Sequence, residues 1–321
     1  MLRYYFQLFR ISNIFTVPSD ILAGYFVTSL FGIALVIYHN IMFLVFSSIF
    51  LYIGGMITND LFDINRDKIE RPNRPLTSGK IKKPTAISLA MLFFGMGMLL
   101  ALLLTFTSTI IAISLVVMIL LYNFKMKNGS LRPFFMGGIR SLNIVYGASF
   151  NFDLLNIQNH GFDTIPIYNT YINLSILTAA VFVHVFTLTL LSKRETEIEN
   201  KQFIKSLELK KIFRIYFFLL IMLTFLGTLF LPNKSLFLTY SVLFLTSITI
   251  IFFTITSKKN YGHMDIQFLV KSMLVLLIPL DASYIAGSGG LYMGLLSLGM
   301  IIPCIAIGKK VNMTWIINKQ H

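Results

Sequence analysis

The chain has 321 residues, of which 56% are hydrophobic and only 12% are charged, and its mean hydropathy is +0.76. Soluble domains carry about 25% charged residues, so this composition excludes an ordinary soluble protein and predicts a membrane-embedded one. The net charge of +14 does not indicate a nucleic-acid partner, because the basic residues form short clusters between apolar segments, a pattern that reports membrane topology.

Ten apolar segments follow one another along the chain, and most approach the roughly 20 residues that a helix needs to cross a bilayer. In numerical order they are 14–38, 41–58, 85–107, 109–122, 134–152, 171–191, 212–231, 235–256, 266–286 and 291–307. We therefore expect a single all-α domain over residues 1–321, a polytopic bundle of nine or ten transmembrane helices.

The distribution of charge favours ten spans over nine. With the N-terminus in the cytoplasm, ten spans place 26 of the 27 Lys and Arg residues on the cytoplasmic side and leave only Lys234 outside. Nine spans would leave the three lysines after residue 308 on the wrong side. The sequence thus predicts a multi-pass protein of the cell membrane with both termini cytoplasmic. Three polar loops, 59–82, 123–133 and 192–211, would then close over a central cavity that opens to the cytoplasm.

The first of these loops is dense in charge, whereas residues 41–57 and 84–122 on either side carry none. If the preceding helix continues into it, Asn59, Asp63 and Asp67 recur every four residues on one face, with Asp60 beside them. Stacked carboxylates repel one another, so this face predicts a divalent cation, and Mg²⁺ usually binds together with phosphate oxygens. A solvated loop whose acids merely pair with arginines is the alternative, but it leaves the four-residue recurrence unexplained.

Downstream, two Arg-Pro pairs at 71–75 predict a rigid turn, because each proline fixes its own φ and restricts the residue before it. Asn-Asp-x-x-Asp-x-x-x-Asp at 59–67, followed by Arg-Pro-x-Arg-Pro-Leu-x-Ser-Gly at 71–79, resembles the first aspartate-rich motif of the UbiA superfamily of intramembrane prenyltransferases. Within it, the motif is most similar to the branch with chlorophyll synthase and archaeal digeranylgeranylglyceryl phosphate synthase. The segments 10–20 and 138–143 resemble the UbiA-like EboC group.

The resemblance implies a helical bundle in which Mg²⁺ ions hold a prenyl diphosphate, whose allylic bond ionises before an acceptor attacks. Diphosphate leaves only when its developing charge is neutralised in a water-poor site. The implied metal ligands are Asn59, Asp60, Asp63 and Asp67, with Asp63 and Asp67 also catalytic. The implied diphosphate contacts are Arg10, Asn13, Arg74, Tyr122, Lys125, Arg140 and Asn143. The partners are the prenyl diphosphate, an acceptor of unknown identity and membrane lipids.

A second acidic motif is expected after the sixth span, where the family usually carries an aspartate pair. Here Glu195 and Glu199 keep the four-residue spacing, with side chains one methylene longer. They complete the Mg²⁺ site in one interpretation. In the other they belong to an amphipathic surface helix with ordinary ion pairs, and the sequence leaves both open.

Two carboxylates and a histidine lie well inside apolar spans, where an unpaired charge is costly. Asp20 and Asp281 should therefore have a partner or a raised pKa, and we expect His184 to be a satisfied contact between helices. Charged residues within spans also suit a different class of protein. That alternative is a UbiA-like carrier that binds a polyprenyl phosphate lipid without transferring it.

Overall fold

The computed structural model describes residues 2–29, 38–126, 129–158, 164–198, 204–256, 260–261 and 263–308. In chain order its helices are α1 (Leu2–Leu8), α2 (Ile11–Ile14), α3 (Thr16–Thr28), α4 (Tyr38–Phe62), α5 (Ile64–Glu70), α6 (Lys83–Leu102), α7 (Phe106–Leu121), the π-helical turn η1 (Tyr122–Met126), α8 (Arg132–Gln158), α9 (Thr164–Ile198), α10 (Ser206–Phe230), α11 (Lys234–Thr256), α12 (His263–Val275), α13 (Leu277–Gly289) and α14 (Leu291–Gly299). The two-residue strands β1 (Ile204–Lys205) and β2 (Asn260–Tyr261) pair antiparallel.

Eight stretches of the described residues are long and apolar enough to cross a bilayer. They are Asn40–Phe62, Lys83–Leu102, Phe106–Lys125, Tyr168–Ser192, Lys210–Phe230, Lys234–Phe253, Asp265–Gly289 and Leu291–Gly308. The first predicted span is described only through α3, and α8 carries several polar residues, so neither is among the eight. The all-α multi-pass fold is confirmed, whereas the count of ten spans stays a prediction.

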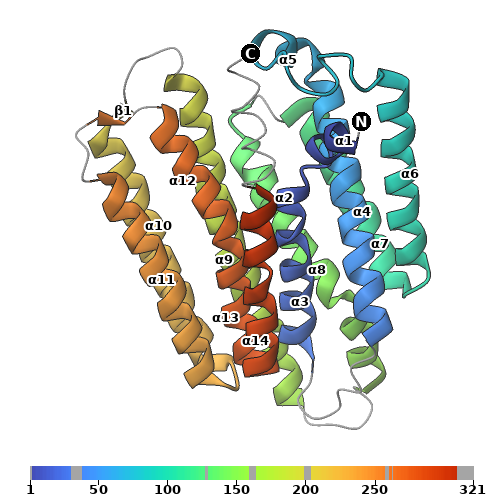
Figure 1. The fold of residues 1–321 in the computed structure, drawn as a ribbon. Helices are drawn as coiled ribbons and strands as arrows, with labels where there is room; N and C mark the ends of the chain where they lie inside the picture. The colour runs from blue at the N-terminus through green and yellow to red at the C-terminus, as the bar shows by residue number, and fades with distance from the viewer. Residues whose placement is uncertain are drawn as a thin grey trace.

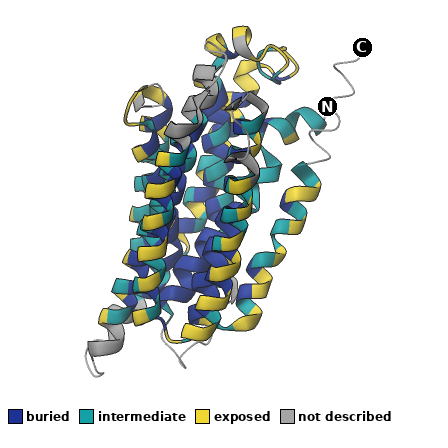
Figure 2. Ribbon diagram, turned by 90° about the vertical axis from the view of Figure 1, so that its left-hand side faces the viewer, coloured by how far each residue is buried: buried dark blue, intermediate teal, exposed yellow. Residues whose placement is uncertain are grey.

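The helices stand side by side as a bundle, with α5 and α1 at the same end (Figure 1). Helices α10 and α11 form one flank and α6 the other, while α3, α4, α8, α9 and α13 lie between them. Exposed residues follow the outward faces of the helices and buried residues the inward faces (Figure 2). Many exposed side chains are large and apolar, such as Phe218, Phe225 and Phe253, as expected for helices that face lipid.

Helices α3 and α8 approach each other at backbone distance, because both carry glycine where they cross. A Cβ atom on Gly24 would overlap the carbonyl oxygen of Ile144, and one on Gly147 would overlap that of Ile21. Small residues of this kind let transmembrane helices pack closely. The contact fixes α3 against the middle of α8, which brings Asp20 within reach of Arg140.

His184 on α9 confirms the expectation of a satisfied contact between helices. Its Nδ1 lies 2.6 Å from the hydroxyl of Tyr216 on α10, and its Nε2 lies 2.7 Å from the carbonyl oxygen of Met273 on α12. A carbonyl only accepts, so Nε2 donates to Met273 and Nδ1 accepts the Tyr216 proton. The imidazole therefore joins three helices as a neutral group.

Candidate functional site

A cavity of about 370 Å³ lies inside the bundle, bounded by residues of α2 to α5, α7 to α9, α12 and α13. The part of the cavity nearer the end of the bundle that carries α5 is lined by charged residues, and we call it the charged tier. We call the five arginines that line this tier the mouth arginines: Arg10, Arg66, Arg71, Arg74 and Arg132. Other parts of the wall are apolar, formed by Leu51, Leu115, Ile119, Ile139, Val185, Leu188, Leu274 and Leu277.

The acidic face predicted from the sequence forms one wall of the charged tier. Helix α4 ends at Phe62 and α5 begins at Ile64, but the four-residue repeat continues across the junction. The amide of Asp63 donates to the carbonyl of Asn59 at 3.1 Å, and the amide of Asp67 donates to that of Asp63 at 2.8 Å. Asn59, Asp63 and Asp67 all line the cavity, which confirms that they share one face.

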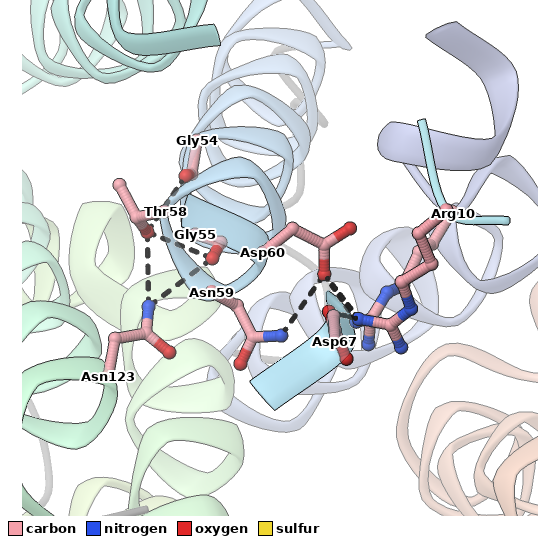
Figure 3. Close-up of polar contacts among 9 residues, drawn as sticks. Arg10, Gly54, Gly55, Thr58, Asn59, Asp60, Asp67 and Asn123 are labelled. Carbon is pink, nitrogen blue, oxygen red and sulfur yellow. Dashed lines mark hydrogen bonds and ion pairs between the residues drawn. The ribbon is translucent and has the colours of Figure 1, made fainter. Parts of the chain in front are cut away.

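Asp60 has a different environment from its neighbours, because it is not among the residues that line the cavity. Its Oδ1 accepts from Arg10 at 2.9 Å and from Arg74 at 3.1 Å, and the amide nitrogen of Asn59 lies 3.4 Å away. Figure 3 shows Asp60 directed toward Arg10. The Asp60 side chain is only 6% exposed. Asp60 therefore contacts Arg10 and Arg74 from a position outside the cavity lining.

Arg74 connects the two parts of the acidic segment, since it also donates to Oδ2 of Asp67 at 2.6 Å. Burial lowers the pKa of Arg74 in spite of the nearby carboxylates. Burial likewise raises the pKa of Asp67 above its usual value and outweighs the attraction of Arg74. The Asp67 carboxylate is therefore incompletely compensated, and a bound cation would stabilise its charged form.

The Arg-Pro turn, which its prolines predict to be rigid, is bridged by Thr77. The Thr77 hydroxyl lies within 3.2 Å of the carbonyl oxygens of Arg71, Pro72 and Arg74. Gly79 has a positive φ of 70°, a conformation that glycine adopts without strain. The turn thus folds back on itself and presents Arg74 to the acidic wall.

Of the residues expected after the fourth span, Tyr122 is buried and lines the cavity, whereas Lys125 is exposed and is not part of the lining. Asn123, which the sequence did not single out, lies on the wall instead. Its amide nitrogen lies 3.0 Å from the Thr58 hydroxyl and 3.3 Å from the carbonyl oxygen of Gly55 (Figure 3). Tyr122 and Asn123 both belong to the π-helical turn η1, and such turns often occur at functional sites.

Arg132 is a second cavity residue that sequence reasoning missed. It lies at the start of α8, and its Nη2 is 3.4 Å from the hydroxyl of Ser192 near the end of α9. Its Nε is buried and has no hydrogen-bond partner. No motif marked Arg132, because a basic residue at a helix start reads equally well as a topology signal.

Further along the helices lies an inner tier of four cavity-lining residues, Thr16, Ser48, Arg140 and Asn143. Ser48 donates to Oδ1 of Asn143 at 2.5 Å, and the Asn143 amide donates to Asp20 at 3.0 Å. Arg140 donates to Asp20 at 2.6 Å and also to the Thr16 hydroxyl. Arg140 and Asn143 thus line the cavity as expected, while their side chains are tied to α3 and α4.

Asp20 and Asp281 each have a polar partner for Oδ2, whereas Oδ1 of each carboxyl group is buried without a hydrogen-bond partner among the described residues. Asp20 is paired with Arg140, and Asp281 accepts a hydrogen bond from Ser19 at 2.5 Å. Both carboxyl groups are fully buried and lie beside each other behind the inner tier. This network ties α3 to α8 and α13.

The remaining expected ligands, Glu195 and Glu199, fall outside the residues whose side chains the structure describes. Among the described residues, no group of three or more His, Cys, Asp or Glu side chains is gathered around one point. Mg²⁺ does not need such a group, because it is usually held by one or two carboxylates together with substrate phosphates and water. The oxygen donors of Asn59, Asp63 and Asp67 on one wall fit that coordination.

Fold and cavity together define a multi-pass helical membrane protein with an acidic and arginine-rich site inside the bundle. The chain belongs to the UbiA prenyltransferase family, which it matches over residues 20–278. This confirms the resemblance carried by the acidic motif.

Relatives with curated names match one part of the chain. The digeranylgeranylglyceryl phosphate synthase of Sulfurisphaera tokodaii is 41% identical over 93 residues, 29% of this chain and 32% of that protein. The enzyme of the same name from Methanocaldococcus jannaschii is 35% identical over 96 residues, 30% of this chain and 33% of that protein. The matched region thus spans about a third of each relative.

Solved structures share the fold over nearly the whole chain. One from a study of digeranylgeranylglyceryl phosphate synthase in membranes has a TM-score of 0.61 at 21% identity and covers 90% of this chain and 99% of its own. A UbiA homologue from Archaeoglobus fulgidus, bound to GPP and Mg²⁺, has a TM-score of 0.60 at 15% identity, with 88% and 99% covered. At these identities the likeness establishes the fold.

Proposed function

We propose that this protein catalyses the Mg²⁺-dependent transfer of a prenyl group from a prenyl diphosphate to a lipophilic or aromatic acceptor within the membrane. The observation that carries the proposal is the charged tier, where Asn59, Asp63 and Asp67 share a wall beside the mouth arginines. A similarly folded homologue binds GPP and Mg²⁺, which supports the same ligands here. The curated relatives are named as synthases of a prenylated lipid.

Asp63 and Asp67 would hold the metal, with Asn59 as a further oxygen ligand. When bound, Mg²⁺ supplies positive charge to the departing diphosphate. Arg74 reaches the same region through its contact with Asp67, so it can donate to a phosphate oxygen. Asp60 acts as a positioning residue in this scheme, because it contacts Arg10 and Arg74 from outside the cavity.

The apolar part of the cavity wall would exclude water from the reacting carbon. Leu115, Ile119, Val185, Leu188 and Leu274 come from three different helices and line the same space as the acids. A carbocation formed there would meet no water to quench it, so the acceptor could capture it. Transfer instead of hydrolysis is the expected outcome.

Two further expectations belong to this proposal. Glu195 and Glu199 would hold a second Mg²⁺, in the place of the family's usual aspartate pair. The charged tier would open to the cytoplasm, with both termini on that side of the cell membrane, as the distribution of Lys and Arg predicts.

The experiment is to reconstitute the protein in lipid nanodiscs with prenyl diphosphates of increasing length and to measure pyrophosphate release with and without Mg²⁺. Release should require Mg²⁺ and should be lost in Asp63→Asn and Asp67→Asn, which keep size but remove charge. Asp153→Asn serves as the matched control, because Asp153 lies near the C-terminal end of α8 and does not line the cavity. Tight Mg²⁺-dependent binding without pyrophosphate release would instead favour a non-catalytic carrier of a polyprenyl phosphate lipid.

A further inference from the structure

The backbone positions that carry the charged tier and the inner tier are separated along the bundle by more than the length of a diphosphate. Arg132 and Arg140 both line the cavity from α8, eight residues apart, which is about 12 Å along a helix axis. Asn59 and Ser48 line it from α4 with a separation of eleven residues, about 16 Å. A diphosphate is shorter than either distance. A diphosphate held at the acidic wall therefore leaves the inner tier available to a second ligand.

The two tiers also differ in charge. Among the residues whose side chains the structure describes, the five mouth arginines of the charged tier outnumber Asp63, Asp67 and the adjacent Asp60, so this part of the site is positive and suits an anion. In the inner tier the one cation, Arg140, is already paired with the fully buried Asp20 at 2.6 Å.

Asp281 does not reverse this balance. It lies beside Asp20 and accepts from Ser19, so it adds either no charge or one negative charge to the inner tier. With Asp20 ionised in its ion pair with Arg140, the inner tier is therefore neutral or negative whether or not Asp281 carries a proton. An anionic head group there would lose its hydration without gaining a net positive partner, which is strongly unfavourable.

An uncharged polar head group, in contrast to an anionic one, finds suitable partners in the inner tier. Thr16 and Ser48 line the cavity with hydroxyl groups that already donate, to the Asn13 carbonyl and to Oδ1 of Asn143. Their oxygens and Oδ1 of Asn143 keep lone pairs, so a hydroxyl on the ligand can donate to one of them without displacing an existing hydrogen bond. The surrounding wall is apolar, so a lipophilic body would be accommodated next to that hydroxyl.

From these observations we infer that the inner tier is the acceptor subsite and that it selects an uncharged, hydroxyl-bearing lipophilic acceptor over an anionic one. This inference rests on the proposed prenyl transfer and specifies its acceptor. Asp20 is the residue that sets the selection, because it cancels the charge of Arg140 without itself lining the cavity. The curated relatives, by contrast, are named for a product that carries a phosphate.

The test compares a long-chain 1-O-alkylglycerol with its phosphate ester, which differ only in the charge of the head group. Binding is measured by thermal shift in nanodiscs with Mg²⁺ and inorganic pyrophosphate present in excess, so that the charged tier is occupied. The alcohol should bind at least tenfold more tightly than the phosphate. Equal or tighter binding of the phosphate overturns the inference, whether or not the protein catalyses transfer.

Asp20→Asn provides the second measurement, because it leaves Arg140 uncancelled and makes the inner tier more positive. The preference should shift at least tenfold toward the phosphate, while Asp153→Asn should retain the wild-type ratio. An unchanged ratio in a folded Asp20→Asn variant would also overturn the inference. If that variant does not fold, the wild-type comparison decides alone. Absence of pyrophosphate release with any prenyl diphosphate would instead count against the proposed function, independently of the binding ratio.

Discussion

Replacing Asp60 with asparagine separates a positioning role from metal binding in the acidic segment. Asp60→Asn keeps the shape of the side chain but removes the negative charge that Arg10 and Arg74 contact at 2.9 and 3.1 Å. Hydrogen bonds to charged groups contribute about 1.5–3 kcal/mol each. The side chains of Arg10 and Arg74 remain 32% and 21% exposed, so solvent screens part of their interaction with Asp60. We expect a loss of about 2 kcal/mol in unfolding free energy for the pair.

The assay has two readouts on the same nanodisc preparation. Thermal unfolding without ligand should show a midpoint lowered by about 4 °C, the shift that a loss of this size causes in a large domain. Prenyl diphosphate binding should weaken, because the two arginines lose their anchor, yet it should still require Mg²⁺. Loss of the Mg²⁺ requirement in Asp60→Asn, as expected for Asp63→Asn, would refute the positioning role and return Asp60 to the metal site.

Three further predictions concern other parts of the molecule. If Glu195 and Glu199 hold a second Mg²⁺, changing both to Gln should abolish pyrophosphate release while Asp at both is tolerated; equal activity of the two variants would exclude that site. Since burial raises the pKa of Asp67, protons should compete with Mg²⁺ for its carboxylate. Mg²⁺ affinity measured over a pH series should therefore begin to fall, on acidification, at a pH above the usual range of an aspartate pKa. A similar pH profile in Asp67→Asn would contradict this. Gly147→Val should lower the free energy of chemical unfolding by about 1–3 kcal/mol, because the new side chain meets the Ile21 carbonyl. A wild-type unfolding transition would show that α3 and α8 lie further apart.

Local pattern in the sequence was enough to predict several features that the structure shows. Hydropathy identified the helical bundle, because a backbone in lipid must satisfy its hydrogen bonds within a helix. The four-residue repeat placed Asn59, Asp63 and Asp67 on one wall, because helical periodicity is local and persists across the short break at Asp63. The cost of an unpaired charge in a span predicted partners for Asp20 and Asp281 without naming them.

The identity of those partners was decided by tertiary packing. Asp20 meets Arg140, 120 residues away, because glycines on α3 and α8 allow a close crossing whose register no local pattern encodes. Similarly, Asp60 turns from its acidic neighbours toward Arg10, 50 residues earlier in the chain. The sequence determined which residue types could bind a metal and a diphosphate. Only the packing of distant helices determined which charges cancel, and with them the electrostatic difference between the two tiers, because such cancellation depends on distances between side chains from separate spans.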